Sequence, residues 1–172
     1  MIRAVFPGTF DPIHYGHMDI ARRAVRLFDE LIVAVFDRPL KSLMFDPDER
    51  IYLVRQAFLD EPRIKVIGYS GLTVDFCRKV DAQVIVRGLR VFSDFEFEFR
   101  MALANHRLVP DIESVALITN EEHTFLSSTT VREIAMLQGD VSSMVPIHVE
   151  EALKRKIVET PDGLVPPNAL RD

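Results

Sequence analysis

The chain has 172 residues, of which 48% are hydrophobic and 27% are charged, and this composition predicts one globular domain with a full core. The formal net charge of −5 excludes the broad basic field that nucleic-acid-binding proteins use, and the single cysteine, Cys77, excludes an internal disulfide. The first residues lack a signal-peptide pattern and no apolar run approaches the ~20 residues of a membrane span, so we expect a soluble, cytoplasmic protein that binds neither nucleic acid nor membrane.

Strand-like and helix-like patterns alternate from the first residues onward. The apolar run Ile2–Phe6 predicts a strand, and the following segment, Met18–Phe28, places its apolar residues on one helical face. Leu31–Phe36 is apolar throughout, which is typical of a strand buried on both faces of a sheet. Residues 46–49 read Asp-Pro-Asp-Glu, a capping box with proline in the first turn, and they predict a helix to about Phe58.

The alternation continues through the middle of the chain. Ile64–Ile67 predicts a third strand, Thr73–Val80 a helix and Ala82–Val86 a fourth strand. Residues 93–96 read Ser-Asp-Phe-Glu, a second capping box, and predict a helix to about Leu108.

Three more elements follow. Ser114–Ile118 predicts the fifth strand, and the Thr-Val-Arg-Glu pattern at 130–133 predicts a capped helix that stops near Gly139. A last helix covers about Val149–Val158. We therefore expect one domain over residues 1–158 and a proline-rich, frayed tail over 159–172.

Five strands separated by helices predict an α/β fold, a single-domain Rossmann-like open five-stranded parallel sheet with helices on both faces. Ligands of such sheets bind beyond the carboxyl ends of the strands. The loops after the first, second, fourth and fifth strands carry cations, imidazoles and hydroxyls, namely Thr9, His14, His17, Lys41, Arg87, Arg90, Ser127, Ser128 and Thr129. We expect these side chains to share one pocket.

The segment Pro7–His17 predicts the chemistry of that pocket. It bends through glycine and proline and brings two histidines to the start of a helix, where unpaired N–H groups and partial positive charge bind phosphate. Neither a Walker A loop nor a GxGxxG loop is present, and no Ser-His-Asp elbow or zinc-ligand spacing appears. Phosphoryl or nucleotidyl transfer needs such a set of cations and hydroxyls, because catalysis there is alignment and charge neutralisation.

Each element also has a simpler interpretation. His17 could be no more than a helix cap, and with His14 it could bind a metal only if a third ligand were available. Lys41 could be a solvated surface lysine, and Arg87 and Arg90 a surface pair. The serine- and threonine-rich turn could be a polar helix entry. Three phenylalanines on one helical face are more often core or subunit interface than a base-stacking surface, namely Phe92, Phe95 and Phe99. Cys77, in an apolar helical stretch, is expected to be a buried small hydrophobe.

Two motifs resemble the nucleotidyltransferase superfamily that carries an HxGH sequence. They are His14-Tyr15-Gly16-His17 and the later turn at 125–132, which reads Phe-Leu-Ser-Ser-Thr-Thr-Val-Arg. Within that superfamily the chain is similar to the bacterial phosphopantetheine adenylyltransferase family. The similarity rests on residues 6–12, on Lys41 ahead of Met44-Phe45 and Glu49-Arg50, and on residues 86–90, 94–98 and 138–141. It extends to about Val158.

The resemblance implies a nucleotidyltransferase domain over residues 1–158 that acts in coenzyme A biosynthesis. It would transfer the adenylyl group of ATP to 4′-phosphopantetheine and release dephospho-coenzyme A (dephospho-CoA) and pyrophosphate. The resemblance also implies Mg²⁺ carried on the ATP phosphates, without a metal site made by the protein, and a cytoplasmic homohexamer.

The resemblance implies roles for individual residues. His17 would donate to the α-phosphate and stabilise the transition state, while Thr9 and Lys41 would orient the attacking phosphate. Arg87 and Thr73 would bind phosphopantetheine. The ATP site would comprise Thr9, Phe10, His17, Gly88, Leu89, Arg90, Glu98, His123, Thr124, Phe125, Leu126, Ser127, Ser128 and Thr129. Three of these positions depart from the usual pattern, since His123-Thr124 replaces an aromatic residue and serine, and Thr129 replaces a serine.

Two alternatives stay open at the level of sequence. The acceptor could be a different one, such as nicotinamide mononucleotide, since the Ser-Ser-Thr turn followed by Arg132 fits that branch of the superfamily too. The chain could also be a non-catalytic nucleotide-binding module on the same fold, because fold alone does not determine activity.

Overall fold

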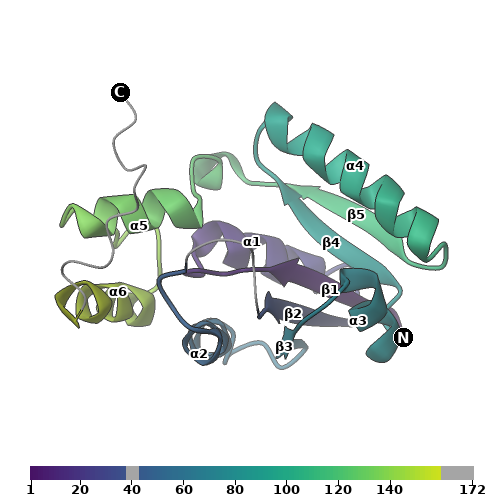
Figure 1. The fold of residues 1–172 in the computed structure, drawn as a ribbon, viewed down its shortest axis with the longest axis horizontal. Helices are drawn as coiled ribbons and strands as arrows, with labels where there is room; N and C mark the ends of the chain where they lie inside the picture. Colours follow the sequence, from purple (N-terminus) through teal and green to yellow (C-terminus); the bar gives the residue numbers. More distant parts are fainter. Residues whose placement is uncertain (38–42, 160–172) are drawn as a thin grey trace.

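The computed structural model describes residues 1–37 and 43–159. Within these ranges a sheet of five parallel strands has the order β3-β2-β1-β4-β5 (Figure 1). The strands are β1 (Arg3–Gly8), β2 (Glu30–Phe36), β3 (Ile64–Tyr69), β4 (Val84–Leu89) and β5 (Glu113–Ile118). The predicted fold class is confirmed. The chain builds outward from β1 to one edge and then returns to the other side of β1, so the strand order reverses between β1 and β4, where open parallel sheets bind ligands.

Helices cover both faces of the sheet (Figure 1). They are α1 (Tyr15–Ala24), α2 (Pro47–Ala57), α3 (Thr73–Lys79), α4 (Phe92–Leu108), α5 (Ser128–Met136) and α6 (Ile147–Glu159), with a 3₁₀ turn, η1, at Glu121–His123. None of the helices in the described ranges is long and apolar enough to span a membrane.

Alternate residues of the central strands enter two hydrophobic cores, one on each face. On β2, Leu31, Val33 and Val35 pack with α1, α2, α5 and α6, while Ile32 and Ala34 pack with α3 and with the segment that follows α4. This double burial explains why β2 is apolar throughout. The second core also contains Cys77, which is fully buried as expected, and burial raises the pKa of its thiol to about 12.

Local capping signals predicted the start of α2 correctly and the starts of α4 and α5 wrongly. Asp46 and Glu49 form the expected capping box, each side chain accepting from the other's backbone N–H at 2.8 Å. Helix α4 instead begins at Phe92, directly after the extended residue Val91, without a side-chain cap.

Helix α5 begins three residues earlier than the capping pattern at 130–133 predicts. Ser127 is its cap, and the Ser127 hydroxyl accepts from the Thr130 N–H at 3.0 Å. In both α4 and α5 the helix starts as soon as the backbone leaves its extended conformation, and the later capping pattern lies inside the first turn.

Two element boundaries change the description of the ligand site. Helix α1 begins at Tyr15 and not at Met18, so both histidines belong to its first turn and cap. Strand β4 continues to Leu89, so Arg87 projects from a strand and not from the loop after it. The remaining ends differ from the predicted ones by a few residues, as helix and strand ends commonly do.

The phenylalanines on α4 are not core residues where their side chains are described. Phe95 and Phe99 are each 51% exposed, and their rings stack on one another at 5.8 Å. The core interpretation is therefore wrong for these two residues.

Candidate active site

A cavity of about 360 Å³ opens at the carboxyl end of the sheet, beside the point where the strand order reverses. It is formed by the loop after β1, the first turn of α1, the end of β4, the first half of α4 and the start of α5. Most of the predicted site residues in the described ranges line it, namely Thr9, Phe10, His14, His17, Arg87, Gly88, Arg90, Glu98, Ser127, Ser128 and Thr129. The expected convergence on one pocket is confirmed for this set.

The two histidines hold one another through the backbone of α1. The His14 N–H donates to Nδ1 of His17 at 3.3 Å, and the His17 N–H donates to Nδ1 of His14 at 3.4 Å. Because each Nδ1 accepts, the hydrogen-bond network places the ring N–H of each imidazole on Nε2. His17 thus takes part in the helix cap through Nδ1 and carries its N–H on Nε2. The same side chain lines the cavity.

His14 is a structural partner for His17. The His14 side chain is only 4% exposed, and its ring stacks on that of His17 with centroids 3.6 Å apart. Burial above all, together with the nearby charges of Arg90 and His123, lowers the pKa of His14 to about 3. His14 is therefore neutral at pH 7 and is the cap of α1.

The turn after β1 positions the His17 ring. Phe10 has a positive φ of 50°, which is uncommon for a residue with a side chain, and its ring is 2% exposed. That ring packs edge-on against the His17 ring at 4.9 Å. The Phe10 ring thus supports the His17 imidazole, and because it is buried it does not offer an open face on which a base could stack.

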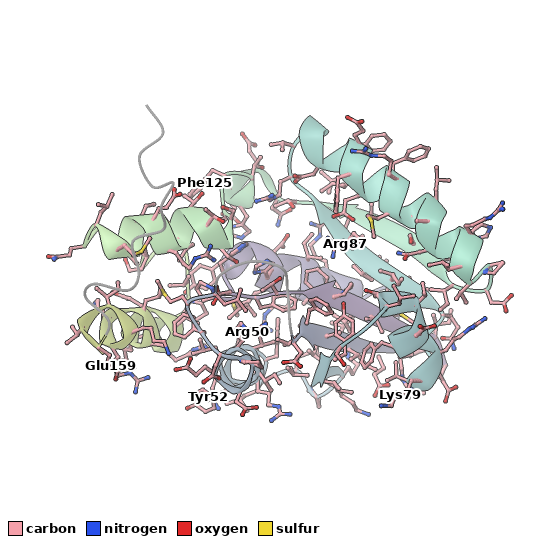
Figure 2. All side chains as sticks on the ribbon, in the orientation of Figure 1. Arg50, Tyr52, Lys79, Arg87, Phe125 and Glu159 are labelled. Atoms are coloured by element: carbon pink, nitrogen blue, oxygen red, sulfur yellow. The ribbon has the colours of Figure 1, made fainter. Side chains whose placement is uncertain are left out.

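Arg87 lies beneath α4 (Figure 2) and is paired with a carboxylate. Its Nε and Nη2 donate to the two carboxylate oxygens of Glu98 at 2.7 and 2.6 Å, and its Nη1 donates to the carbonyl of Pro7 at 2.8 Å. A bidentate pair of this kind is geometrically specific. The end of β1 and the first half of α4 are therefore joined through one guanidinium.

Arg90 makes the corresponding link to α5. Its Nε donates to Asp94 at 3.1 Å and its Nη1 donates to the carbonyl of Leu126 at 2.8 Å. Both predicted arginines therefore reach the cavity, and each brings a carboxylate from α4. Glu98 is among the predicted site residues and Asp94 is not, although Asp94 follows Arg90 by four residues, a recognisable ion-pair spacing.

The start of α5 supplies hydroxyls and a helix N-terminus. The Ser128 hydroxyl donates to the carbonyl of Pro12 at 2.9 Å, which ties α5 to the loop after β1. Ser127 caps the helix, and Thr129 lies 3.5 Å from the Arg132 guanidinium. Backbone N–H groups and the helix dipole at this point favour an anion.

A second compartment of about 480 Å³ adjoins the first and shares with it Pro7, Gly8, Thr9, Arg87 and Glu98. Thr73 lines this compartment, where its hydroxyl lies 3.0 Å from the Tyr69 hydroxyl. Met101 and Ala102 of α4 form an apolar wall opposite. The two compartments together suit an elongated ligand that is anionic at one end and partly apolar at the other.

Several predicted site residues do not line the main cavity. Leu89 borders a separate shallow pocket, Phe125 is 59% exposed, and the Leu126 side chain is buried while its carbonyl faces Arg90. Thr124 donates to the carbonyl of Asn120 at 3.3 Å, and the 3₁₀ turn that ends at His123 lies against Gly16. Lys41 lies outside the described residues.

Two buried charged residues next to the cavity were missed as functional candidates. Asp11 is 1% exposed and accepts from the backbone of the approach to α2, while Arg50 is completely buried and donates to the carbonyl of Thr9, which lines the cavity. Arg50 lies between α2 and the sheet (Figure 2). The family resemblance includes Glu49-Arg50, but an arginine near the start of a helix is ordinarily solvated, so the sequence did not predict its burial.

Comparison with known proteins places this geometry in a family. The family model described as cytidylyltransferase-like matches residues 5–134, a range that begins in β1 and ends in α5. The chain belongs to this cytidylyltransferase-like family of nucleotidyltransferases. It is 56% identical over 155 residues to the phosphopantetheine adenylyltransferase of Roseiflexus castenholzii, a match that covers 90% of this chain and 97% of the relative. It is 50% identical over 155 residues to the phosphopantetheine adenylyltransferase of Methylococcus capsulatus, covering 90% and 96%.

Within the family the chain therefore groups with the phosphopantetheine adenylyltransferases. Among solved structures, a putative nicotinate-nucleotide adenylyltransferase from Vibrio parahaemolyticus superposes with a TM-score of 0.67 and covers 90% of this chain and 99% of that one. Its sequence identity of 22% shows a common fold.

Proposed function

We propose that the chain transfers the adenylyl group of ATP to 4′-phosphopantetheine, giving dephospho-CoA and pyrophosphate. The observation that carries the proposal is the His17 Nε2–H donor in a cavity that also holds Thr9, Arg87 and the start of α5. The adjoining compartment at Thr73 offers room for the pantetheine arm. The identity of about 50% to several phosphopantetheine adenylyltransferases supports the choice of acceptor.

The reaction needs alignment and charge stabilisation from the protein. A phosphate oxygen of the acceptor attacks the α-phosphorus of ATP in line, a P–O bond forms, and the bond from the α-phosphorus to the bridging oxygen breaks. Pyrophosphate leaves with that electron pair. Because the acceptor phosphate is already an anion, the step does not require a general base.

The side chains take complementary roles in this proposal. His17 donates through Nε2 to a non-bridging α-phosphate oxygen, where negative charge grows in the transition state. Thr9 and Lys41 orient the attacking phosphate, while Arg87 and Thr73 bind the acceptor. The start of α5 and Arg90 receive the outer phosphates of ATP.

Magnesium enters in this proposal on the triphosphate, as MgATP. Within residues 1–37 and 43–159 no three His, Cys, Asp or Glu side chains come together in a way that would hold a metal ion. In this proposal the metal ion belongs to the substrate, because Mg²⁺ is commonly bound through substrate phosphates.

We also propose a homohexamer that works in the cytoplasm. Large apolar side chains are exposed along α4 and at the end of β5, and they are Val91, Phe95, Phe97, Phe99, Met101, Leu103, Leu108 and Ile118. Such a surface supports self-association, because soluble monomers rarely expose a contiguous apolar patch of this kind. Light scattering coupled to gel filtration measures the number of subunits.

A pyrophosphate-release assay tests the activity. With MgATP present, phosphopantetheine is expected to support turnover and nicotinamide mononucleotide is not. If neither acceptor leads to release of pyrophosphate, the result would favour the non-catalytic alternative. His17→Ala should keep the fold and lower kcat by at least ~10²–10³-fold, the loss typical of one preorganised donor. His106→Ala, on the exposed surface of α4, is the matched control and should turn over like the wild type. Activity of His17→Ala within a few-fold of wild type would remove His17 from the transition state.

A further inference from the structure

Among the residues that the structure describes, Arg50 is the largest side chain that is fully buried, although arginine is rarely buried at all. Taking a guanidinium out of water is costly unless its donors are hydrogen-bonded. Replacing such a charge by an apolar side chain is often neutral or stabilising, so stability alone gives a weak reason for an arginine at this position. Its partners indicate what the residue does.

Within the described ranges the hydrogen bonds of Arg50 all go to backbone carbonyls. Nη1 donates to Thr9 at 2.8 Å and to Phe36 at 2.7 Å, Nη2 donates to Asp37 at 3.0 Å, and Nε donates to Phe45 at 3.2 Å. These carbonyls belong to three separate segments, which are the turn after β1, the end of β2 and the approach to α2. A planar guanidinium with five N–H donors can bond all three at once.

The Asp11 carboxylate accepts hydrogen bonds from backbone N–H groups of the approach to α2. Its two carboxylate oxygens accept from the backbone N–H of Met44 and of Phe45, each at 2.9 Å, and the Asp11 side chain is 1% exposed. Phe45 is thus held through its carbonyl by Arg50 and through its N–H by Asp11. The turn after β1 and the approach to α2 are joined by two buried charges of opposite sign.

The turn that Arg50 holds is the one that supports His17. The Thr9 carbonyl accepts from Arg50, while Thr9 itself lines the cavity. The next residue, Phe10, has φ of 50°, and such a conformation persists when the surroundings impose it. The ring of Phe10 then packs against the His17 ring. A change at Arg50 is therefore transmitted to the imidazole through the backbone of two residues.

We propose that Arg50 is a positioning residue for adenylyl transfer, which sets the Thr9–Phe10 turn and through it the place of the His17 ring. The inference rests on the proposed function for its catalytic consequence. Arg50 touches no substrate in this scheme. It acts on the rate because a displacement of about 1 Å at a catalytic group can cost roughly 10²-fold.

Arg50→Lys tests the proposal, because it keeps the charge and loses the planar fork that reaches three segments. We expect kcat to fall by roughly 10- to 100-fold while KM for ATP stays within about threefold of wild type. Val54→Ala is the matched control, since Val54 is fully buried one turn further along α2 and packs in the core. It should lower the unfolding temperature and leave kcat within about twofold. Equal losses of kcat in the two variants, or an unchanged kcat in Arg50→Lys, would overturn the proposal.

A second readout does not depend on turnover. Amide hydrogen exchange at Phe10 and Phe45 should accelerate in Arg50→Lys relative to the amides of β1, and in Val54→Ala it should not. If the wild type releases no pyrophosphate, the proposed function fails, and the exchange pattern still decides whether Arg50 sets the turn. If Arg50→Lys does not fold, Asp11→Asn perturbs the same junction from the opposite side and should give the same loss of kcat and the same pattern of exchange. Wild-type kcat and exchange in that variant would refute the inference.

Discussion

Replacement of His14 by asparagine should remove a defined part of the acid sensitivity of the fold. The His14 side chain caps α1 by accepting the N–H of His17, and burial lowers its pKa to about 3, against 6.5 in an unfolded chain. As the pH falls, the unfolded state therefore binds a proton before the folded state does. The stabilisation that depends on neutral His14 is complete above pH 6.5 and is lost progressively as the pH falls from 6.5 toward 3.

The size of the effect follows from the difference between the two pKa values. Each pH unit inside this window costs about 1.4 kcal/mol of unfolding free energy. Between about pH 7.5 and pH 4.5 the His14 contribution is therefore roughly 2–3 kcal/mol. Asparagine is also a good helix cap and does not titrate, so His14→Asn should retain stability near neutral pH and lose less of it in acid.

Urea unfolding of the wild type and of His14→Asn, at one protein concentration and at both pH values, measures this difference. Carboxylates and other histidines titrate in both proteins, so their effects cancel when the two losses are subtracted. The expected result is a wild-type loss that exceeds the variant's loss by about 2 kcal/mol or more. If the two proteins lose the same unfolding free energy, His14 is not held neutral by burial and the assignment of its role fails.

Two further predictions concern the walls of the cavity. Gly8→Ala places a Cβ 2.8 Å from the Phe10 ring, so it should lower the unfolding free energy by about 1–3 kcal/mol and also reduce kcat. Wild-type stability in this variant would show that the ring can move aside at no cost. Glu98→Gln removes the counter-charge of Arg87, and calorimetric titration with phosphopantetheine in the absence of ATP should show binding tighter by roughly fivefold, about 1 kcal/mol; weaker binding would mean that Glu98 itself contacts the acceptor.

The pairing of Arg87 has a consequence for ligand recognition. In the described structure its guanidinium already makes three hydrogen bonds, two of them to Glu98. An incoming phosphate must therefore compete with a carboxylate or bind at a face of the guanidinium that Glu98 leaves open. A phosphate alone gains less binding free energy from a cation that is already paired. The site should therefore favour an acceptor that also fills the Thr73 compartment.

Much of the fold follows from patterns that are local in the sequence. The uninterrupted apolar run of β2 predicted a strand buried on two faces, because alternate residues of such a strand must enter different cores. The capping box at Asp46 predicted the start of α2, since both partners lie within one turn. The His14–His17 motif after the first strand predicted a ligand pocket at this place, and its two histidines do line a cavity there.

Only the tertiary structure decided which charged groups are paired and which residue bonds the backbone turn beside the cavity. Arg50 looks like an ordinary arginine of a helix, and its function depends on a carbonyl 41 residues earlier in the chain. The partners of Arg87 lie 11 and 80 residues away, and Arg132 meets Asp11 across 121 residues. Sequence periodicity reports the surroundings of a residue within about one turn of helix or along one strand. The burial of a charge and the choice of its partner depend on how distant segments pack, so they are settled only when the sheet and its helices are assembled.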